Sequence, residues 1–142
     1  MTALAIGALL VVLLGVAHHA GMIAIRKLTP GSGAGTQATI IASFCCLLVL
    51  HMLEIGGFAL AYGVLLDLGW IGGFGDRFDG SWESLVYYSG MNFVTLGYSQ
   101  LQAEGPIRLV SMMQSLGGFM VLTWSATFIY SVSQATWNRS SR

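Results

Sequence analysis

Three long apolar stretches dominate the chain, separated by one short basic segment and one long segment rich in glycine and acidic residues. They cover residues 2–25, 38–66 and 107–133, and each is long enough to cross a bilayer, which takes about 20 residues. The first stretch has no basic residue ahead of its apolar part and is longer than that of a secretory signal, so we expect a retained helix. The pattern therefore predicts an all-α membrane protein with three transmembrane helices.

A shorter amphipathic stretch lies between the second and third of these helices. Ser81 or Asp79 can cap a helix over residues 82–93, with Glu83 in its first turn. A helix of this length rises only about 18 Å, which is too short to span. We therefore predict a re-entrant helix followed by extended backbone over residues 94–99. Such backbone is tolerated at membrane depth only where protein buries it or where it lines a water-filled path.

Composition agrees with a membrane protein. The 142 residues are 55% hydrophobic and only 8% charged, with a mean hydropathy of +0.73, whereas a soluble domain carries about 25% charged residues. This length fits one domain. The formal net charge of zero argues against a nucleic-acid partner. Cys45 and Cys46 are adjacent within an apolar run, so packing is favoured for them over metal or redox chemistry.

Basic residues in the short connections predict the orientation. Arg26 and Lys27 follow the first apolar stretch, and Arg139 and Arg142 follow the third. The connection between the second and third stretches is instead mainly acidic. We therefore expect the N-terminus and this acidic connection outside and the C-terminus in the cytoplasm.

Residues 94–99 contain the candidate cation-binding site. In the run Thr95-Leu96-Gly97-Tyr98-Ser99, consecutive backbone carbonyls and the Thr95 hydroxyl can replace the water around a dehydrated K⁺. Gly97 tolerates backbone angles that a side chain would forbid, and Tyr98 can brace the segment from behind. The sequence thus predicts a selectivity filter that holds K⁺ at Thr95, Leu96, Gly97 and Tyr98, with Ser99 at the outer rim.

The sequence resembles the pore-loop potassium channels, and more closely a group of small bacterial ion channels with one extra helix before a two-helix pore unit. The resemblance covers about residues 40–134 and implies a homotetramer, because each chain supplies one pore loop. The residues that carry it are Tyr87-Tyr88-Ser89, Thr95-Leu96-Gly97-Tyr98, Gly117-Gly118, Thr123-Trp124-Ser125 and His51-Met52-Leu53-Glu54-Ile55. The resemblance also implies the inner (plasma) membrane of a bacterium. Together with the hydropathy and charge pattern, it divides the chain into an N-terminal helix 1–25, a cytoplasmic loop 26–36, a pore domain 37–134 (outer helix 38–66, extracellular loop 67–80, pore helix 82–93, filter 94–99, inner helix 107–133) and a cytoplasmic tail 135–142.

The filter departs from the family pattern Thr-x-Gly-Tyr-Gly-Asp at its outer end. Ser99 replaces a glycine whose backbone often needs a conformation that is costly for a residue with a Cβ. Gln100 removes the acidic group of the outer mouth, and Val94 replaces the usual threonine before the filter. We therefore expect a K⁺-preferring channel that discriminates less sharply against Na⁺.

Polar side chains within the apolar stretches are further candidates. His51 and Glu54 lie three residues apart on one face of the second helix, where a charged, unpaired carboxylate costs several kcal/mol. A hydrogen-bonded pair that ties this helix to the pore helix or the last helix is the favoured interpretation. A proton-sensing or gating role stays open, and a metal site is disfavoured because one His-x-x-Glu supplies too few ligands. His18 and His19 are expected to hydrogen-bond between helices.

The last helix carries small and polar residues at helical spacing: Ser111, Gln114, Ser115, Gly118 and Ser125. They can line the cavity below the filter, which we favour, or allow close helix packing. Gly117 and Gly118 can permit a bend used in gating or can serve packing.

Two other classes of function compete with a channel. A haem-binding anchor would use His18 or His19 with His51, but residue counts from the helix ends place His19 and His51 about 10 Å apart in depth. A non-catalytic adaptor subunit would leave the re-entrant segment unexplained. No nucleophile–base pair or phosphate-binding loop occurs, so we expect neither an enzyme nor a cofactor. The expected partners are membrane lipid, further copies of the chain, and permeant K⁺ and Na⁺.

Overall fold

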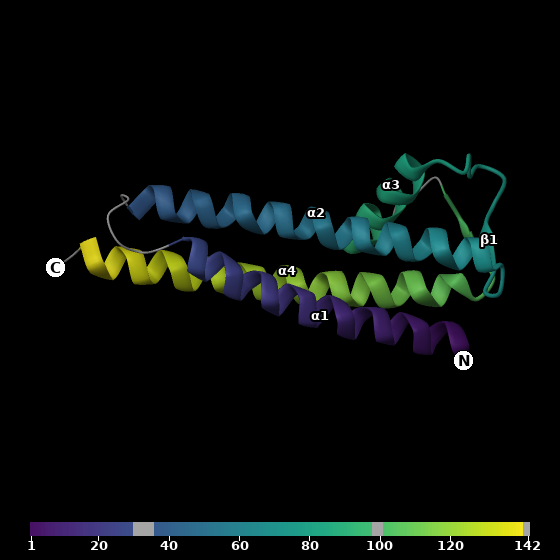
Figure 1. Cartoon of the computed structure of the whole chain (residues 1–142), viewed down its shortest axis with the longest axis horizontal. Coiled ribbons are helices and arrows are strands. Elements are labelled where there is room, and N and C mark those ends of the chain that lie inside the picture. The colour runs from purple at the N-terminus through teal and green to yellow at the C-terminus, as the bar shows by residue number, and fades with distance from the viewer. Residues whose placement is uncertain (30–35, 98–100, 141–142) are drawn as a thin grey trace.

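The computed structural model describes residues 1–29, 36–97 and 101–140. Three long helices, α1 (Thr2–Leu28), α2 (Thr36–Leu68) and α4 (Ile107–Ser140), run side by side along the molecule (Figure 1). Each contains an apolar segment long enough to cross a membrane. The prediction of an all-α membrane protein with three candidate spans is confirmed.

The helices differ from the predicted ranges mainly at their ends. The short helix α3 (Trp82–Phe93) has the bounds predicted for the pore helix. By contrast, α4 continues seven residues beyond the predicted end at Ser133, into the segment expected to be a tail. Neither glycine nor proline occurs in that extension, so nothing in its backbone chemistry stops the helix there.

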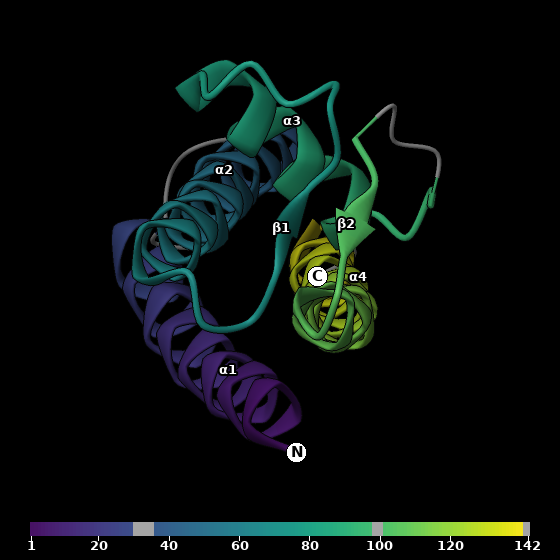
Figure 2. The same ribbon diagram turned by 90° about the vertical axis from the view of Figure 1, so that its right-hand side faces the viewer.

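The short helix α3 lies on one side of the α2–α4 pair and α1 on the other side (Figure 2). The larger buried cluster joins all four helices and includes Leu14 of α1, Phe58 and Tyr62 of α2, Phe93 of α3 and Val110 of α4. Large apolar side chains remain exposed along α2 and α4 of the single chain, for example Phe44, Leu60, Leu116 and Phe119. This is the pattern expected where lipid or further protein covers the helices.

A two-residue antiparallel pairing joins the two ends of the segment that contains α3. Strand β1 (Gly73–Phe74) pairs with β2 (Ala103–Glu104), with Gly73 opposite Glu104 and Phe74 opposite Ala103. The approach is close: Gly72 has a φ of +96°, and a Cβ there would overlap the carbonyl oxygen of Glu104. The segment therefore enters and leaves at the same end of the molecule, as a re-entrant segment must.

The start of α3 is capped by Ser81, one of the two candidates that the sequence offered. The Ser81 hydroxyl accepts a hydrogen bond from the backbone N–H of Ser84 (3.1 Å), so Ser81 is the N-cap. The Asp79 carboxylate accepts one from the backbone N–H of Ser81 (3.0 Å). This hydrogen bond, with others from Ser84 and Ser81, lowers the pKa of Asp79 to about 2, so its carboxylate is charged at neutral pH.

Candidate functional site

The C-terminal end of α3 leads directly into the predicted filter. The backbone N–H of Val94 still donates to Gly90, whereas that of Thr95 donates to Asn92 (3.0 Å). Thr95 then adopts a left-handed φ of +58°, and Gly97 has a φ of +65°. The expectation of extended backbone is therefore wrong at Thr95 and Gly97, because a left-handed turn ends the helix. Tyr98, Ser99 and Gln100 lie outside the described residues.

Burial changes abruptly at this turn. Phe93, the last residue of α3, is completely buried, whereas Thr95, Leu96 and Gly97 are exposed in the single chain. Leu96 is 66% exposed although it is a large apolar residue. A segment that is held from behind and bare in front can be covered by further copies of the chain.

Buried hydrogen bonds hold α3 against α2 and α4. Gln114 of α4 is fully buried and donates from Nε2 to the carbonyl oxygen of Ser89 (3.1 Å) and to its hydroxyl (2.8 Å). The Ser89 hydroxyl donates in turn to the carbonyl of Ile55 on α2 (2.8 Å). The hydroxyl of Tyr62, also on α2, donates to Gln114 Oε1 (2.8 Å). Because buried polar groups are costly when unpaired, this network specifies one position of α3.

A second set of contacts fixes the outer half of α3. The hydroxyls of Tyr88 and Ser111 lie 2.6 Å apart, which joins α3 to α4. The rings of Tyr62 and Phe74 lie edge-on to Tyr88, at centroid distances of 5.2 and 4.5 Å. Strand β1 is thus packed against the same aromatic cluster, which holds the loop that carries β1 against α3.

Gly117 and Gly118 lie where α4 approaches two other helices. A Cβ on Gly118 would lie 2.9 Å from the carbonyl carbon and the Cα of Phe93, and still closer to the carbonyl oxygen. A Cβ on Gly117 would instead meet side-chain atoms of Val11 and Leu14 of α1 at 3.0–3.1 Å. Helix α4 continues through both residues. The two glycines therefore serve close packing in this structure, Gly118 directly beneath the end of α3.

The pore-lining interpretation of the polar stripe on α4 is wrong for four of its five residues, while the fifth, Ser115, is half-buried. Ser111, Gln114, Gly118 and Ser125 are buried, and their side chains or backbone contact α1, α2 or α3 of the same chain. In a helix that faces lipid or partner chains on its outer side, polar residues turn toward the internal contacts that satisfy them. The residues of α4 that stay exposed are mainly apolar.

Two histidines and one glutamate from two helices form a cluster in which His18 and Glu54 are buried and His51 is half-buried. His18 Nδ1 of α1 lies 2.8 Å from Glu54 Oε1, and His51 Nδ1 lies 2.9 Å from Glu54 Oε2. On the other side, Ser125 Oγ of α4 lies 3.3 Å from His18 Nε2 and 3.1 Å from His51 Nε2. The predicted His51–Glu54 pair is present and reaches the last helix, since His51 Nε2 lies 3.1 Å from Ser125 Oγ of α4. Glu54 also reaches α1 directly, through His18.

The depth argument against a histidine pair, which compared His19 with His51, fails for the neighbouring pair His18 and His51. Their rings stack at a centroid distance of 5.5 Å. Figure 1 shows that α2 begins nearer the C-terminal end of the molecule than the point at which α1 stops, so counts from the two helix ends do not start at one level. His19, by contrast, is exposed and stacks against Trp124 at 5.7 Å. The expectation that His18 hydrogen-bonds between helices is confirmed by its contact with Glu54 of α2. The sequence did not indicate which residues His18 and Ser125 meet, because these lie 36 and 74 or more residues away.

A polar hollow lies beside the start of α3, near the end of the molecule that carries the β1–β2 pair. Its lining includes Arg77 and the two carboxylates Asp79 and Glu83. With Asp79 charged at neutral pH, this end of the re-entrant segment presents negative charge. Such charge raises the local concentration of cations.

A comparison with known protein families identifies the class of protein. A family model described as an ion channel matches residues 48–135, which is more than half of the chain. The matched region contains most of α2, all of α3 and most of α4, while α1 precedes it. No curated protein and no solved structure matches the chain. The chain belongs to this ion channel family and is an integral membrane protein.

Proposed function

We propose that four copies of this chain form a cation channel that prefers K⁺ and conducts through the backbone carbonyls of residues 95–99. The observation that carries this proposal is the re-entrant arrangement. Helix α3 is held from behind by buried hydrogen bonds, and the residues that follow it, Thr95 to Gly97, are exposed in the single chain. The expected K⁺ ligands are Thr95, Leu96, Gly97 and Tyr98, with Ser99 at the rim.

The backbone angles near the end of α3 support carbonyl coordination. Val94 has a negative φ of −87°, Thr95 a positive φ of +58°, and Gly97 again a positive φ of +65°. When residues alternate between right-handed and left-handed backbone angles, successive peptide planes face the same way. Their carbonyl oxygens can then all point to one side of the chain. An ordinary extended strand instead points successive carbonyls to opposite sides. The left-handed residues thus favour a row of inward carbonyls over a simple strand.

The same arrangement requires several copies around one axis. One chain supplies one re-entrant segment, and a dehydrated K⁺ needs carbonyls from all sides. The C-terminal end of α3 also carries the partial negative charge of the helix dipole toward the interior of the molecule, which favours a cation there. The proposed assembly is a homotetramer, and native mass spectrometry in mild detergent tests it. A monomer or dimer with no larger species would contradict the proposal.

We also propose that the N-terminus and the β1–β2 end face the outside of a bacterial inner membrane and that the C-terminus is cytoplasmic. The basic residues Arg26, Lys27 and Arg139 support this orientation. The first residues of α1 lie at the same end of the molecule as β1, and α4 ends at the opposite end (Figure 1). The proposed activity needs no catalytic residue and no bound cofactor, because K⁺ and Na⁺ are its cargo.

Flux from liposomes, with K⁺ or Na⁺ as the only permeant ion, tests the proposed function. Gly97→Ala is the informative variant, because no heavy atom of the described residues lies within 4 Å of the added Cβ and only the left-handed backbone (φ +65°) opposes it. Gly69 is a matched control with the same features (φ +66°) at the end of α2. Each alanine costs about 1–2 kcal/mol of local backbone energy.

We expect Gly97→Ala to lower K⁺ flux at least tenfold or to reduce its preference over Na⁺, while Gly69→Ala retains both. Equal effects of the two variants would mean that the backbone at Gly97 has no special part in conduction. Absence of flux from the unmodified protein with either ion would contradict the proposed function itself.

A further inference from the structure

The cluster of His18, His51 and Glu54 brings three potential metal ligands together between α1 and α2. One ligand atom from each of the three side chains lies within 4.8 Å of the other two. His18 is completely buried, and Glu54 is 7% exposed. The set consists of two imidazoles and a carboxylate, which is a donor set that Zn²⁺ binds in proteins.

With both imidazoles neutral, a count of hydrogens shows that the cluster is one hydrogen short. Four short contacts form a ring: each Nδ1 with the Glu54 carboxylate, and each Nε2 with the hydroxyl of Ser125. Two neutral imidazoles and one hydroxyl supply three hydrogens, and an ionised carboxylate supplies none. One of the four contacts therefore places two electron pairs against each other. In a buried site such an unmatched contact is costly.

We propose that His18 Nδ1, His51 Nδ1 and the Glu54 carboxylate bind a zinc ion between α1 and α2. With the metal on the two Nδ1 atoms, both imidazoles carry their hydrogen on Nε2. Both Nε2–H groups then donate to Ser125 Oγ, which has two lone pairs to accept them. Every contact of the ring is satisfied in this state. Ser125 acts as the outer partner that sets the tautomer of both ligands, as hydrogen-bonding partners of metal-bound histidines commonly do.

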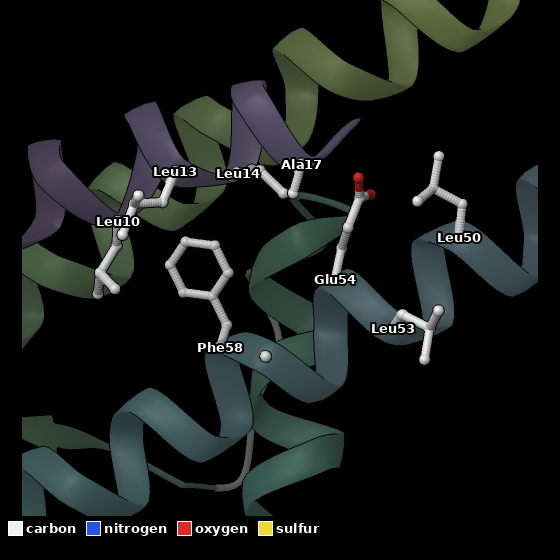
Figure 3. A pocket seen from close by; sticks show the side chains of 9 residues that line it. Leu10, Leu13, Leu14, Ala17, Leu50, Leu53, Glu54 and Phe58 are labelled. Atoms are coloured by element: carbon white, nitrogen blue, oxygen red, sulfur yellow. The ribbon is translucent and has the colours of Figure 1, made fainter. Parts of the chain in front are cut away.

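The three ligand atoms lie within 4.8 Å of one another and must adjust to the spacing that zinc requires. Tetrahedral ligands about 2.0–2.1 Å from zinc lie about 3.3 Å from one another, whereas the Nδ1–carboxylate distances are 2.8 and 2.9 Å. The Glu54 carboxylate must therefore withdraw by roughly 0.5 Å. It lies in a groove of about 370 Å³ between α1 and α2. Figure 3 shows its side chain extending from α2 toward α1, beside Ala17, with apolar neighbours along the groove.

Zinc at this position would join three helices behind the end of α3. The ligands come from α1 and α2, and Ser125 adds α4. The ring of His51 also lies 5.6 Å from that of Phe93, the last residue of α3. The proposed site is independent of ion conduction, since it rests on the buried ligand set alone.

Zinc binding to the metal-free purified protein tests the proposal, with cobalt(II) as a spectroscopic probe. Zinc is measured as metal content per chain after gel filtration, and Co²⁺ by the visible bands that a tetrahedral site produces. The variants are His18→Ala, His51→Ala and Glu54→Gln, with His19→Ala as the control. His19 is the adjacent histidine on α1 and lies outside the cluster, against Trp124.

We expect one bound zinc per chain in the unmodified protein and in His19→Ala. Each ligand variant should lose at least tenfold in affinity, and Ser125→Ala, which removes only the outer partner, about tenfold. Glu54→Gln keeps a hydrogen-bonding side chain of the same length, so loss of metal in this variant at an unchanged gel-filtration volume reports on the ligand rather than on folding. Absence of zinc and of the Co²⁺ bands from the unmodified protein would overturn the proposal, because a proton on one imidazole would then supply the missing hydrogen. Equal zinc affinity in His18→Ala and His19→Ala would also overturn it.

Discussion

Replacement of Gly118 by alanine should weaken the support of the re-entrant segment. Gly118 lies on α4 against the backbone of Phe93. Phe93 precedes Thr95, the first residue of the proposed filter ligands, by two residues. An added Cβ would lie 2.9 Å from the carbonyl carbon and Cα of Phe93, whereas ordinary contacts of this kind are 3.4–4 Å. The opposing atoms belong to the backbone, so they cannot move aside by a change of rotamer. Helix α4 and the end of α3 must separate by at least about 0.5 Å.

Two opposing terms determine the size of this effect. Glycine to alanine within a helix gains about 1 kcal/mol from backbone conformation. Overpacking of a tight contact costs about 1–3 kcal/mol, and a rigid backbone neighbour favours the upper end of that range. The expected net destabilisation is therefore about 2 kcal/mol, or roughly a thirtyfold shift of the folding equilibrium.

Gly117 and Gly15 complete a graded series with Gly118. At Gly117 the added Cβ meets only the side chains of Val11 and Leu14, at 3.0–3.1 Å, and these can shift. At Gly15 no heavy atom of the described residues lies within 4 Å, so only the helix gain remains. Stability in detergent should therefore fall in the order Gly15→Ala, Gly117→Ala, Gly118→Ala. Denaturant unfolding followed by circular dichroism measures it.

The same series separates stability from conduction. Gly118→Ala acts on the end of α3 and should lower K⁺ flux from liposomes, whereas Gly117→Ala acts on the contact with α1 and should largely retain it. If Gly118→Ala is as stable as Gly15→Ala, the close approach of α4 to Phe93 is refuted. If Gly117→Ala is the variant that loses flux, support of the filter does not run through Gly118.

Three further predictions concern other residues. Ser99→Gly combined with Gln100→Asp should sharpen the preference for K⁺ over Na⁺, and each tenfold change in permeability ratio corresponds to about 1.4 kcal/mol; an unchanged reversal potential would place the cause of weak discrimination elsewhere. Glu54→Leu removes the partner of two buried imidazoles and should impair assembly on gel filtration, whereas Glu54→Gln, which keeps a hydrogen-bonding group, should assemble. Gln114→Leu removes the three buried hydrogen bonds that Gln114 makes with Ser89 and Tyr62, at about 0.5–1.5 kcal/mol each, and a thermal midpoint equal to that of the unmodified protein would disprove that role.

Local physical chemistry explains what the sequence predicted well. The three candidate spans follow from unbroken apolar length, and α3 has the predicted bounds because Ser81 caps it and its length excludes a span. The resemblance to an ion channel was also readable, since it depends on short motifs in order along one part of the chain. These properties need no knowledge of which helix faces which.

The tertiary structure alone decided the direction in which the polar residues of the helices point. Gln114 and Ser125 share a helical face, but that periodicity serves a water-filled cavity and a buried network equally well; only the position of α3 against α4 shows that Gln114 pairs with Ser89. Likewise, the meeting of His18 with Glu54 depends on where α1 stops relative to the start of α2. The sequence by itself determined the three candidate spans and the bounds of α3, because apolar length and capping are local properties. Which residues meet depended on the relative depth and rotation of the helices, because packing sets them over the whole molecule.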